Sequence, residues 1–187
     1  THYPEWQDDL KMNLTAAEAE FLKRQIIAAY PNTMLGFILR ENLTQVLECE
    51  SFDDLAELID IFPDHIQEEY ALALQFSHFL YIIRVAYNII ISDGKNEIAN
   101  GEYERLRPLF KEEASADLER VISRLSLAGN GALCTFLRTS QQCILTGDFD
   151  GLCKCIKDRE ILLKGSGRSK TAHPGEFDED AWFGGYY

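Results

Sequence analysis

The sequence predicts an all-α fold, a single bundle of about seven to nine helices around one buried apolar helix at residues 70–92. Apolar residues make up 46% of the 187-residue chain, which is enough for a sizeable core. They recur with helical spacing in most segments, and we find no alternating strand pattern, internal repeat or heptad array. One segment is apolar on all sides, as a helix at the centre of a bundle would be.

That segment, residues 64–92, is the centre of the predicted fold. A helix that is apolar all round lies either in a protein core or in a membrane, and this one is long enough to cross a bilayer. Arg84 lies within it, and an arginine at the middle of a bilayer costs roughly 2.5–3.5 kcal/mol. The other helices are amphipathic and need a surface to pack on. We therefore expect a core helix and no membrane partner.

Residues 1–13 read as a lead-in loop, and residues 14–165 as the helical domain. A first helix begins at the capping box Thr15-Ala16-Ala17-Glu18, where Thr15 and Glu18 can each satisfy a backbone N–H of the other. It ends near Ala29, before Pro31. Besides the central helix, further helices are expected at residues 33–48, 51–62, 102–111, 115–127 (capped by Ser115), 132–145 and 149–163. Turns are expected at residues 93–96, 129–131 and 147–148.

Residues 166–187 read as a flexible tail, basic at first, then acidic, and ending in Trp182-Phe183-Gly184-Gly185-Tyr186-Tyr187. An apolar close is unusual for a frayed natural terminus, and the chain begins with Thr1. We therefore expect this chain to be a fragment that continues into a longer protein.

The chain is acidic, with 31 acidic and 18 basic residues and a formal charge of −13. This balance disfavours broad binding to nucleic acid or to anionic membranes. The charge is uneven, because residues 1–70 hold 15 acidic and 4 basic residues, whereas residues 71–187 hold 16 and 14. The second part could therefore accept an anion locally.

Cysteine and carboxylate spacings predict no metal, cofactor or catalytic centre. The five cysteines are odd in number and irregularly spaced, which argues against a disulfide framework and for a reducing, cytoplasmic location. Cys153 and Cys155, with Cys143 nearby, have a one-residue spacer that turns two helical thiols to nearly opposite sides, unlike structural zinc sites. His78 has no evident nucleophile to activate. The acidic clusters at residues 53–60, 68–69 and 176–180 are interpreted as solvated surface.

Polar residues interrupt the central helix. A buried polar seam is predicted there, because buried polar groups need partners that can hold neighbouring helices in register. The alternative is a small polar pocket or partner site. The seam consists of Ser77, His78, Arg84 and Asn88.

Residues 154–170 hold the one local basic bias in the chain. They could contact nucleic acid or another anion, or they could form a solvated helix end and loop, since the Gly-Ser-Gly that follows Lys164 lacks the spacing of a phosphate-binding loop. The candidate contact residues are Lys154, Lys157, Arg159, Lys164, Arg168 and Lys170.

Several short motifs of this chain occur in an order that resembles the order in a bacterial family known only as a domain of unknown function. The motifs are Leu14-Thr15-Ala16-Ala17-Glu18-Ala19-Glu20-Phe21-Leu22 before Met34-Leu35, Phe76-Ser77-His78 with Tyr87-Asn88, Cys134-x-Phe136-Leu137, Arg159-Glu160-x-x-Leu163-Lys164-Gly165, and Trp182-Phe183-Gly184-Gly185-Tyr186. The chain resembles the C-terminal half of that family. It departs from the family pattern at His78, where a small residue is usual, and after Lys170, where an acidic insert replaces an arginine-rich stretch.

The resemblance implies a role in phage defence, because genes of that family lie beside helicase-type and phospholipase-D-like nuclease genes of defence or restriction character. It implies no catalytic residue. Our leading interpretation is a non-enzymatic interaction or scaffolding component with a protein partner, and with nucleic acid as a second candidate partner. The alternatives are a nuclease-type effector whose active site lies outside this fragment, and a ligand-sensing helical domain that uses the polar seam.

Overall fold

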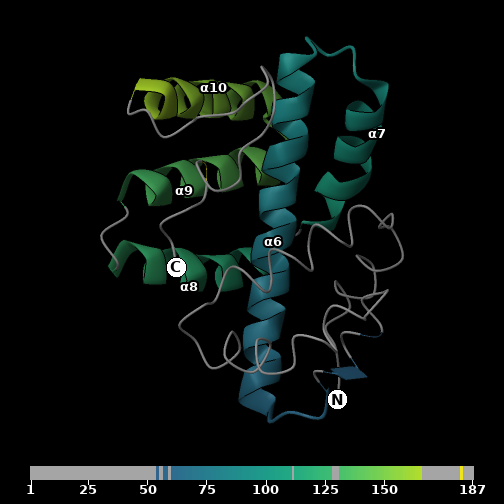
Figure 1. The fold of residues 1–187 in the computed structure, drawn as a ribbon, viewed down its shortest axis with the longest axis vertical. Coiled ribbons are helices and arrows are strands. Elements are labelled where there is room, and N and C mark those ends of the chain that lie inside the picture. Colours follow the sequence, from purple (N-terminus) through teal and green to yellow (C-terminus); the bar gives the residue numbers. More distant parts are fainter. Residues whose placement is uncertain are drawn as a thin grey trace. The chain divides into compact units, whose positions relative to one another are not determined.

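The computed structural model describes residues 54, 57, 58, 60–110, 112–127, 131–165 and 182. Five α-helices and one short 3-10 helix form this described part, which contains no strand (Figure 1). The all-α class is therefore confirmed for these residues. The helices expected at residues 15–29 and 33–48 lie outside the described residues, so the expected total of seven to nine stays a prediction.

The chain divides into two units, Ile82–Tyr186 and Thr1–Tyr81 together with Tyr187. The boundary falls inside helix α6 (Asp64–Ile91), so this helix contributes to both units. The other four described α-helices belong to the second unit, which also holds the candidate site.

Helix α6 begins directly after Pro63, a position where the missing proline N–H costs nothing because the first turn of a helix has no acceptor for it. The backbone N–H of Gln67 donates to the Pro63 carbonyl over 3.3 Å, and its side-chain amide donates to the Phe62 carbonyl over 3.0 Å. Every residue from 75 to 83 is buried, so the helix is enclosed on all sides there, as the sequence predicted.

The segment Gln67–Ile91 is also long and apolar enough to cross a membrane. Of its most apolar window, 76% is buried within the protein. The core helix of a water-soluble protein has the same length and composition, so these two properties do not separate the possibilities. The absence of a membrane partner stays a prediction.

Helix α6 ends in a left-handed turn. Asp93 has φ of 54° and Gly94 has φ of 75°, and the Gly94 N–H donates to the Ile89 carbonyl over 2.9 Å. This bond satisfies one of the last helical carbonyls, as a Schellman turn does. The turn predicted at residues 93–96 is confirmed at its first two positions.

The structure corrects the helix expected at residues 102–111. Helix α7 covers Glu97–Leu106, because Asn96 Oδ1 accepts the Ala99 N–H over 3.1 Å and caps the helix. The sequence interpretation assigned this asparagine to the turn and so began the helix five residues late. The chain then continues as the 3-10 helix η1 (Arg107–Leu109), whose proline removes one of the N–H groups that an α-helix would need.

Helices α8 (Glu112–Leu127), α9 (Gly131–Thr146) and α10 (Phe149–Gly165) lie side by side, with α9 in the middle (Figure 1). Short connections make consecutive helices antiparallel. Between α8 and α9, later residues of one helix contact earlier residues of the other: Cys134 Sγ donates to the Ile122 carbonyl (3.4 Å), Arg138 Nη2 to Glu119 Oε1 (2.7 Å), and Gln141 Nε2 to Ser115 Oγ. The prediction that Ser115 caps α8 is wrong, since the helix begins at Glu112.

The break predicted at residues 147–148 is confirmed. Gly147 has φ of 74°, and the Asp148 N–H donates to the Cys143 carbonyl over 2.9 Å, which ends α9. Asp148 Oδ1 then accepts the Gly151 N–H over 2.9 Å and caps α10. Two residues therefore end one helix and begin the next.

Candidate interaction site

Helix α10 carries four of the six predicted basic contact residues. Lys154, Lys157 and Lys164 are exposed. Arg159 is 6% exposed, so its guanidinium does not face a polyanion in solvent, and its inclusion among the contact residues is corrected. Arg168 and Lys170 lie outside the described residues.

Arg159 is buried because it falls on the inward stripe of α10. The buried residues of this helix recur every three or four positions, which places them on one face: Leu152, Ile156, Arg159 and Leu163. A charged group on such a stripe needs partners, because burial of an unpaired charge is costly. Arg159 Nη2 donates to the Trp182 carbonyl oxygen over 2.8 Å, and its guanidinium carbon lies 5.4 Å from the centroid of the Phe136 ring.

Trp182 completes a cluster of side chains from three helices and the C-terminal segment. Its side chain is buried, with its ring centroid 5.6 Å from that of Tyr87 and 5.9 Å from that of Phe136. The interplanar angles of 64° and 62° are those of edge-to-face packing. We name Trp182, Tyr87, Phe136 and Arg159 the Trp182 cluster.

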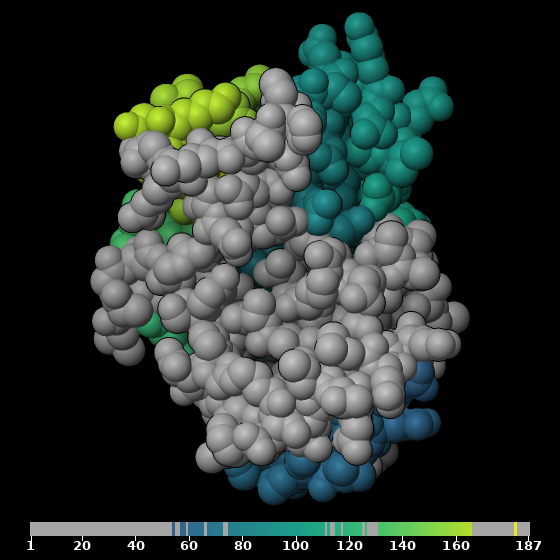
Figure 2. Space-filling view, viewed as in Figure 1, coloured from purple at the N-terminus to yellow at the C-terminus, as the bar shows by residue number. Residues whose placement is uncertain are grey.

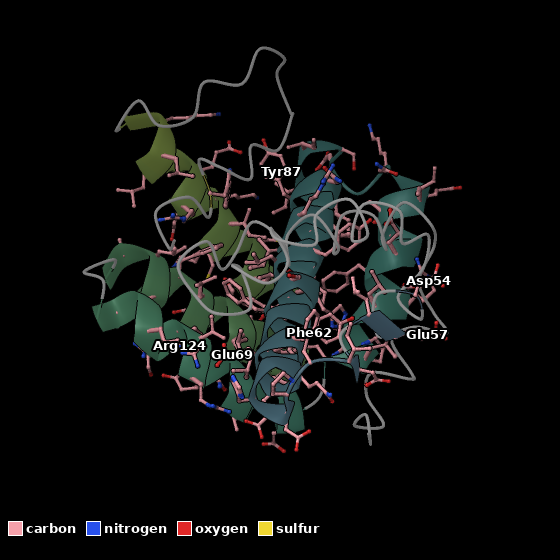
Figure 3. All side chains as sticks on the ribbon, turned by 60° about the horizontal axis from the view of Figure 1, so that its bottom comes forward. Asp54, Glu57, Phe62, Glu69, Tyr87 and Arg124 are labelled. Carbon is pink, nitrogen blue, oxygen red and sulfur yellow. The ribbon has the colours of Figure 1, made fainter. Side chains whose placement is uncertain are left out.

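Tyr87 links this cluster to the surface of α10. Burial raises the pKa of Tyr87 to about 12, and the charge of Glu160 and a hydrogen bond from the phenol to that carboxylate act in the same direction. Figure 3 shows Tyr87 near the end of α6, on the side of α10. Glu160 Oε1 also accepts from Lys164 Nζ over 3.0 Å. One carboxylate therefore joins a buried phenol to an exposed ammonium.

The exposed surface of α10 has no excess of positive charge. Lys154 and Lys157 share it with the exposed carboxylates of Asp150 and Asp158. Lys164, whose side chain is 65% exposed, pairs with Glu160. Among the described residues of α10, nearby carboxylates thus offset the positive charges of the exposed lysines.

The predicted polar seam lies along α6 at two depths. Ser77 and His78 are buried, whereas Arg84 and Asn88 are half-buried. Ser77 Oγ has no hydrogen-bond partner among the described residues. Ser77 and His78 belong to the first unit, and the other two residues to the second. Neither the register role nor the ligand-sensing role of the seam is tested by this placement.

Three thiols lie at the junction of α9 and α10. Burial raises the pKa of the Cys155 thiol to about 11, with a hydrogen bond to Cys143 and the charge of that thiol acting in the same direction. Burial likewise raises the pKa of Cys153. Thiols with raised pKa values are poor nucleophiles at neutral pH. In the described part of the chain, no three His, Cys, Asp or Glu side chains are placed to hold a metal ion.

Tyr103 forms a second aromatic contact in the same unit. Its ring centroid lies 4.9 Å from that of Phe149 at an interplanar angle of 64°. Burial raises its pKa to about 12, opposed by the positive charge of Arg107. The Tyr103 hydroxyl is buried and has no hydrogen-bond partner among the described residues. Its desolvation cost is therefore not offset by a hydrogen bond there, whereas that of Tyr87 is offset by the bond to Glu160.

The sequence interpretation missed the role of Trp182, which it assigned to the aromatic end of a tail. The one available signal was an arginine at a position of α10 where the helical period requires an apolar residue. Compared with protein-family models, with curated proteins and with solved structures, the chain shows no match. The resemblance to a defence-associated family therefore stays a proposal.

Proposed function

We propose that this chain is a non-enzymatic interaction module of a bacterial defence or restriction-type system that acts in the cytoplasm with a protein partner. In this proposal, residues 14–165 form a single bundle of about seven to nine helices around residues 70–92. The defence setting rests on the order of the sequence motifs. The interaction role rests on the surface of α10.

The observation that carries the interaction role is a pair of exposed apolar side chains. Ile161 is 70% exposed and Leu162 is 54% exposed, although their neighbour Leu163 is buried. Both lie off the inward stripe of α10, at positions where a helix normally carries polar residues. Adjacent exposed apolar residues are characteristic of protein-binding surfaces, whereas scattered single ones are ordinary.

Lysines and carboxylates of α10 both lie near this apolar pair. Residues 154, 157, 161 and 164 are three or four positions apart and so share one face of α10, with Leu162 beside it. We name Lys154, Lys157, Ile161, Leu162 and Lys164, which are all exposed, the outer face of α10. Figure 2 shows atoms of α10 at the surface of the protein. Exposed Asp158 lies near the pair and Lys164 is bonded to Glu160, so the pair is an apolar centre among charges of both signs, which fits a partner segment with apolar residues and mixed charges.

Co-purification with the products of adjacent genes tests the proposal. We expect the full chain, co-expressed with them, to capture a helicase-type or nuclease-type product, and Ile161→Glu to abolish the capture. The matched control is Ile98→Glu, because Ile98 is 76% exposed but lies on α7. Loss of capture in both variants, or no capture by the unmodified chain, would contradict the proposed role.

A second candidate function is contact with nucleic acid through Lys154, Lys157 and Lys164. Their exposure favours it, and the neighbouring carboxylates oppose it. If it holds, binding to duplex DNA or RNA weakens as salt rises and weakens further in Lys154→Glu/Lys157→Glu. An absence of binding at low salt removes this candidate and leaves the protein-interaction proposal standing.

A further inference from the structure

We propose that Cys143 on α9 and Cys155 on α10 form a dithiol site, at which a disulfide of low molecular weight oxidises the two thiols reversibly to a bond that joins the helices. The interaction role proposed above concerns the outer face of α10. The present inference concerns two thiols between α9 and α10 and does not depend on that role.

The register of the two helices brings these cysteines to similar heights. The turn at residues 147–148 sets α9 and α10 antiparallel and side by side (Figure 1). Farther from the turn, the Arg159 guanidinium lies over the Phe136 ring and fixes the register. Cys155 is four positions nearer the turn than Arg159, and Cys143 is seven positions nearer than Phe136. The difference of three residues is about 4.5 Å along the helix axes, less than one turn.

Each cysteine also lies on the side of its helix that faces the other helix. Cys143 is 9% exposed and belongs to the buried residues of α9. Cys155 is half-buried, three positions after Leu152 and four before Arg159, which both lie on the inward stripe of α10. The two thiols share a hydrogen bond. A disulfide requires cysteines whose Cα–Cβ bonds point toward each other, and thiols that share a hydrogen bond meet this condition.

The other two described cysteines have different surroundings. Cys134 is buried, and its thiol donates to the Ile122 carbonyl on α8 over 3.4 Å. Cys153 is half-buried like Cys155, but two positions along a helix turn its side chain by roughly 200° away from that of Cys155. The pairing of Cys155 with Cys143 is therefore set by position and not by exposure.

The reaction is a thiol–disulfide exchange in two steps. The Cys155 thiolate, which is the more exposed, attacks one sulfur of the small disulfide, forms a mixed disulfide and releases one small thiolate, which takes up a proton. The Cys143 thiolate then attacks the Cys155 sulfur and displaces the second small thiolate, which is also protonated. The two protein thiols lose two protons and two electrons, and these reduce the small disulfide to two thiols.

The same steps run backward with an excess of a reducing thiol, so the bond is reversible. In a reducing compartment, protein disulfides are transient, and their usual roles are catalytic or redox-sensing. The site would therefore join α9 to α10 only while the surrounding thiol pool is oxidised.

Burial makes the reduced pair slow to react at neutral pH. It raises the pKa of Cys155 to about 11, with the charge of Asp158 acting in the same direction and that of Lys154 opposing it. Burial also raises the pKa of Cys143, and the charge of Asp148 adds to this effect. Since the thiolate is the reactive form, the oxidation is best followed at about pH 8.5, the ordinary pKa of a thiol.

Peptide mapping without reductant tests the site. The native full chain is incubated with oxidised glutathione, alkylated with iodoacetamide, and digested with trypsin and an Asp-specific protease. We expect a Cys143–Cys155 crosslink as the main oxidised product, at least about tenfold more abundant than chains with two glutathionyl groups, because the second thiol acts at a high effective concentration. Dithiothreitol should remove it. The digestion separates the three cysteines because cleavage sites lie between them at Asp148, Asp150 and Lys154.

Single substitutions test the order of the two steps. In Cys143→Ser the reaction should stop at a mixed disulfide on Cys155, and Cys155→Ser should give no crosslink at Cys143. The matched control is Cys153→Ser, which removes an equally half-buried thiol of the same helix and should leave the yield of the crosslink unchanged. If Cys143→Ser does not fold, the mapping of the unmodified chain still decides.

The same assay in urea shows whether the fold directs the pairing. The unfolded chain holds the same five cysteines without their contacts and should give a mixture of pairings. An equal distribution of products in the native and unfolded chains would overturn the proposal. So would a native chain that links Cys143 or Cys155 mainly to another cysteine, carries only mixed disulfides, or is not oxidised under conditions that oxidise the unfolded chain.

Discussion

Arg159 on α10 donates a hydrogen bond from Nη2 to the main-chain carbonyl of Trp182, 23 residues further along the chain, over 2.8 Å. The bond is buried, and it joins a helical guanidinium to the C-terminal segment. It accounts for an arginine on the inward stripe of α10, where its neighbours are leucine and isoleucine.

Arg159→Met should destabilise the fold by about 1.5–3 kcal/mol, the range for hydrogen bonds made by charged groups, because Met keeps much of the apolar stem but cannot donate to Trp182. Urea denaturation measures this change. Lys157→Met, an exposed position on the same helix, should stay within about 0.5 kcal/mol of the unmodified chain. Equal effects of the two substitutions would show that the Arg159 bond contributes nothing.

Tyr87→Phe should lower the free energy of unfolding by about 1.5 kcal/mol, the lower end of the range for bonds to charged groups because Glu160 is half-buried, since it removes the hydrogen bond from the phenol to Glu160 while leaving the ring beside Trp182. Thermal unfolding followed by circular dichroism measures it. An unchanged melting temperature would contradict the bond.

Tyr103→Phe should change the free energy of unfolding in the opposite direction. The Tyr103 hydroxyl is buried without a hydrogen-bond partner among the described residues, so its removal should raise the free energy of unfolding by about 1 kcal/mol. Its ring contact with Phe149 is kept. Destabilisation by this substitution would mean that the hydroxyl has a partner, and a crystal structure would identify it.

Alkaline pH should destabilise the domain through these two phenols. The pKa of Tyr87 and that of Tyr103 are both raised from 10.0 to about 12 in the folded protein. The unfolded chain therefore loses these protons first, so the stabilisation present below pH 10 is lost as the pH rises toward 12. Phenolate absorbance during a pH titration should show at least two late-ionising tyrosines, and one fewer in Tyr87→Phe than in the unmodified chain. If all tyrosines titrate near pH 10, the burial described here is wrong.

Gly147 and Gly101 provide a matched pair for the same substitution. Gly147 has φ of 74°, a conformation that costs an alanine roughly 1–2 kcal/mol, so Gly147→Ala should destabilise. Gly101 lies inside α7 with open space around it, and Gly101→Ala should stabilise by about 0.5–1 kcal/mol through helix propensity. Chemical denaturation of both variants measures these changes in stability. If both substitutions stabilise the fold, or both destabilise it, the left-handed turn between α9 and α10 is contradicted.

Most of the described helices were predictable because their signals are local. The glycine and aspartate at positions 147 and 148 supply a left-handed residue and a capping carboxylate within two positions, whatever surrounds them. The start of α7 was predicted wrongly, although Asn96 is a suitable cap. An asparagine that follows Asp93-Gly94-Lys95 fits a turn as well as a cap, and only the bond to Ala99 distinguishes the two.

The candidate site was less predictable. A count of charges along residues 154–170 treats Lys157 and Arg159 alike, yet one is exposed and the other is buried. The helical period could have separated them, since Arg159 lies in register with Leu152, Ile156 and Leu163. The helical period could not have identified the hydrogen-bond partner of the guanidinium. Trp182 is separated from α10 by 16 residues whose sequence shows no helical period.

The sequence by itself determined the helical class of the described residues, the buried apolar helix α6 and several of the turns, because periodicity and capping act over a few residues. The tertiary structure alone decided which charged residues are buried, which phenol has a partner, and where Trp182 lies. Those outcomes depend on contacts between residues far apart in the chain. Local helix propensity does not distinguish the possible arrangements of such residues, whereas the free energy of burying them does.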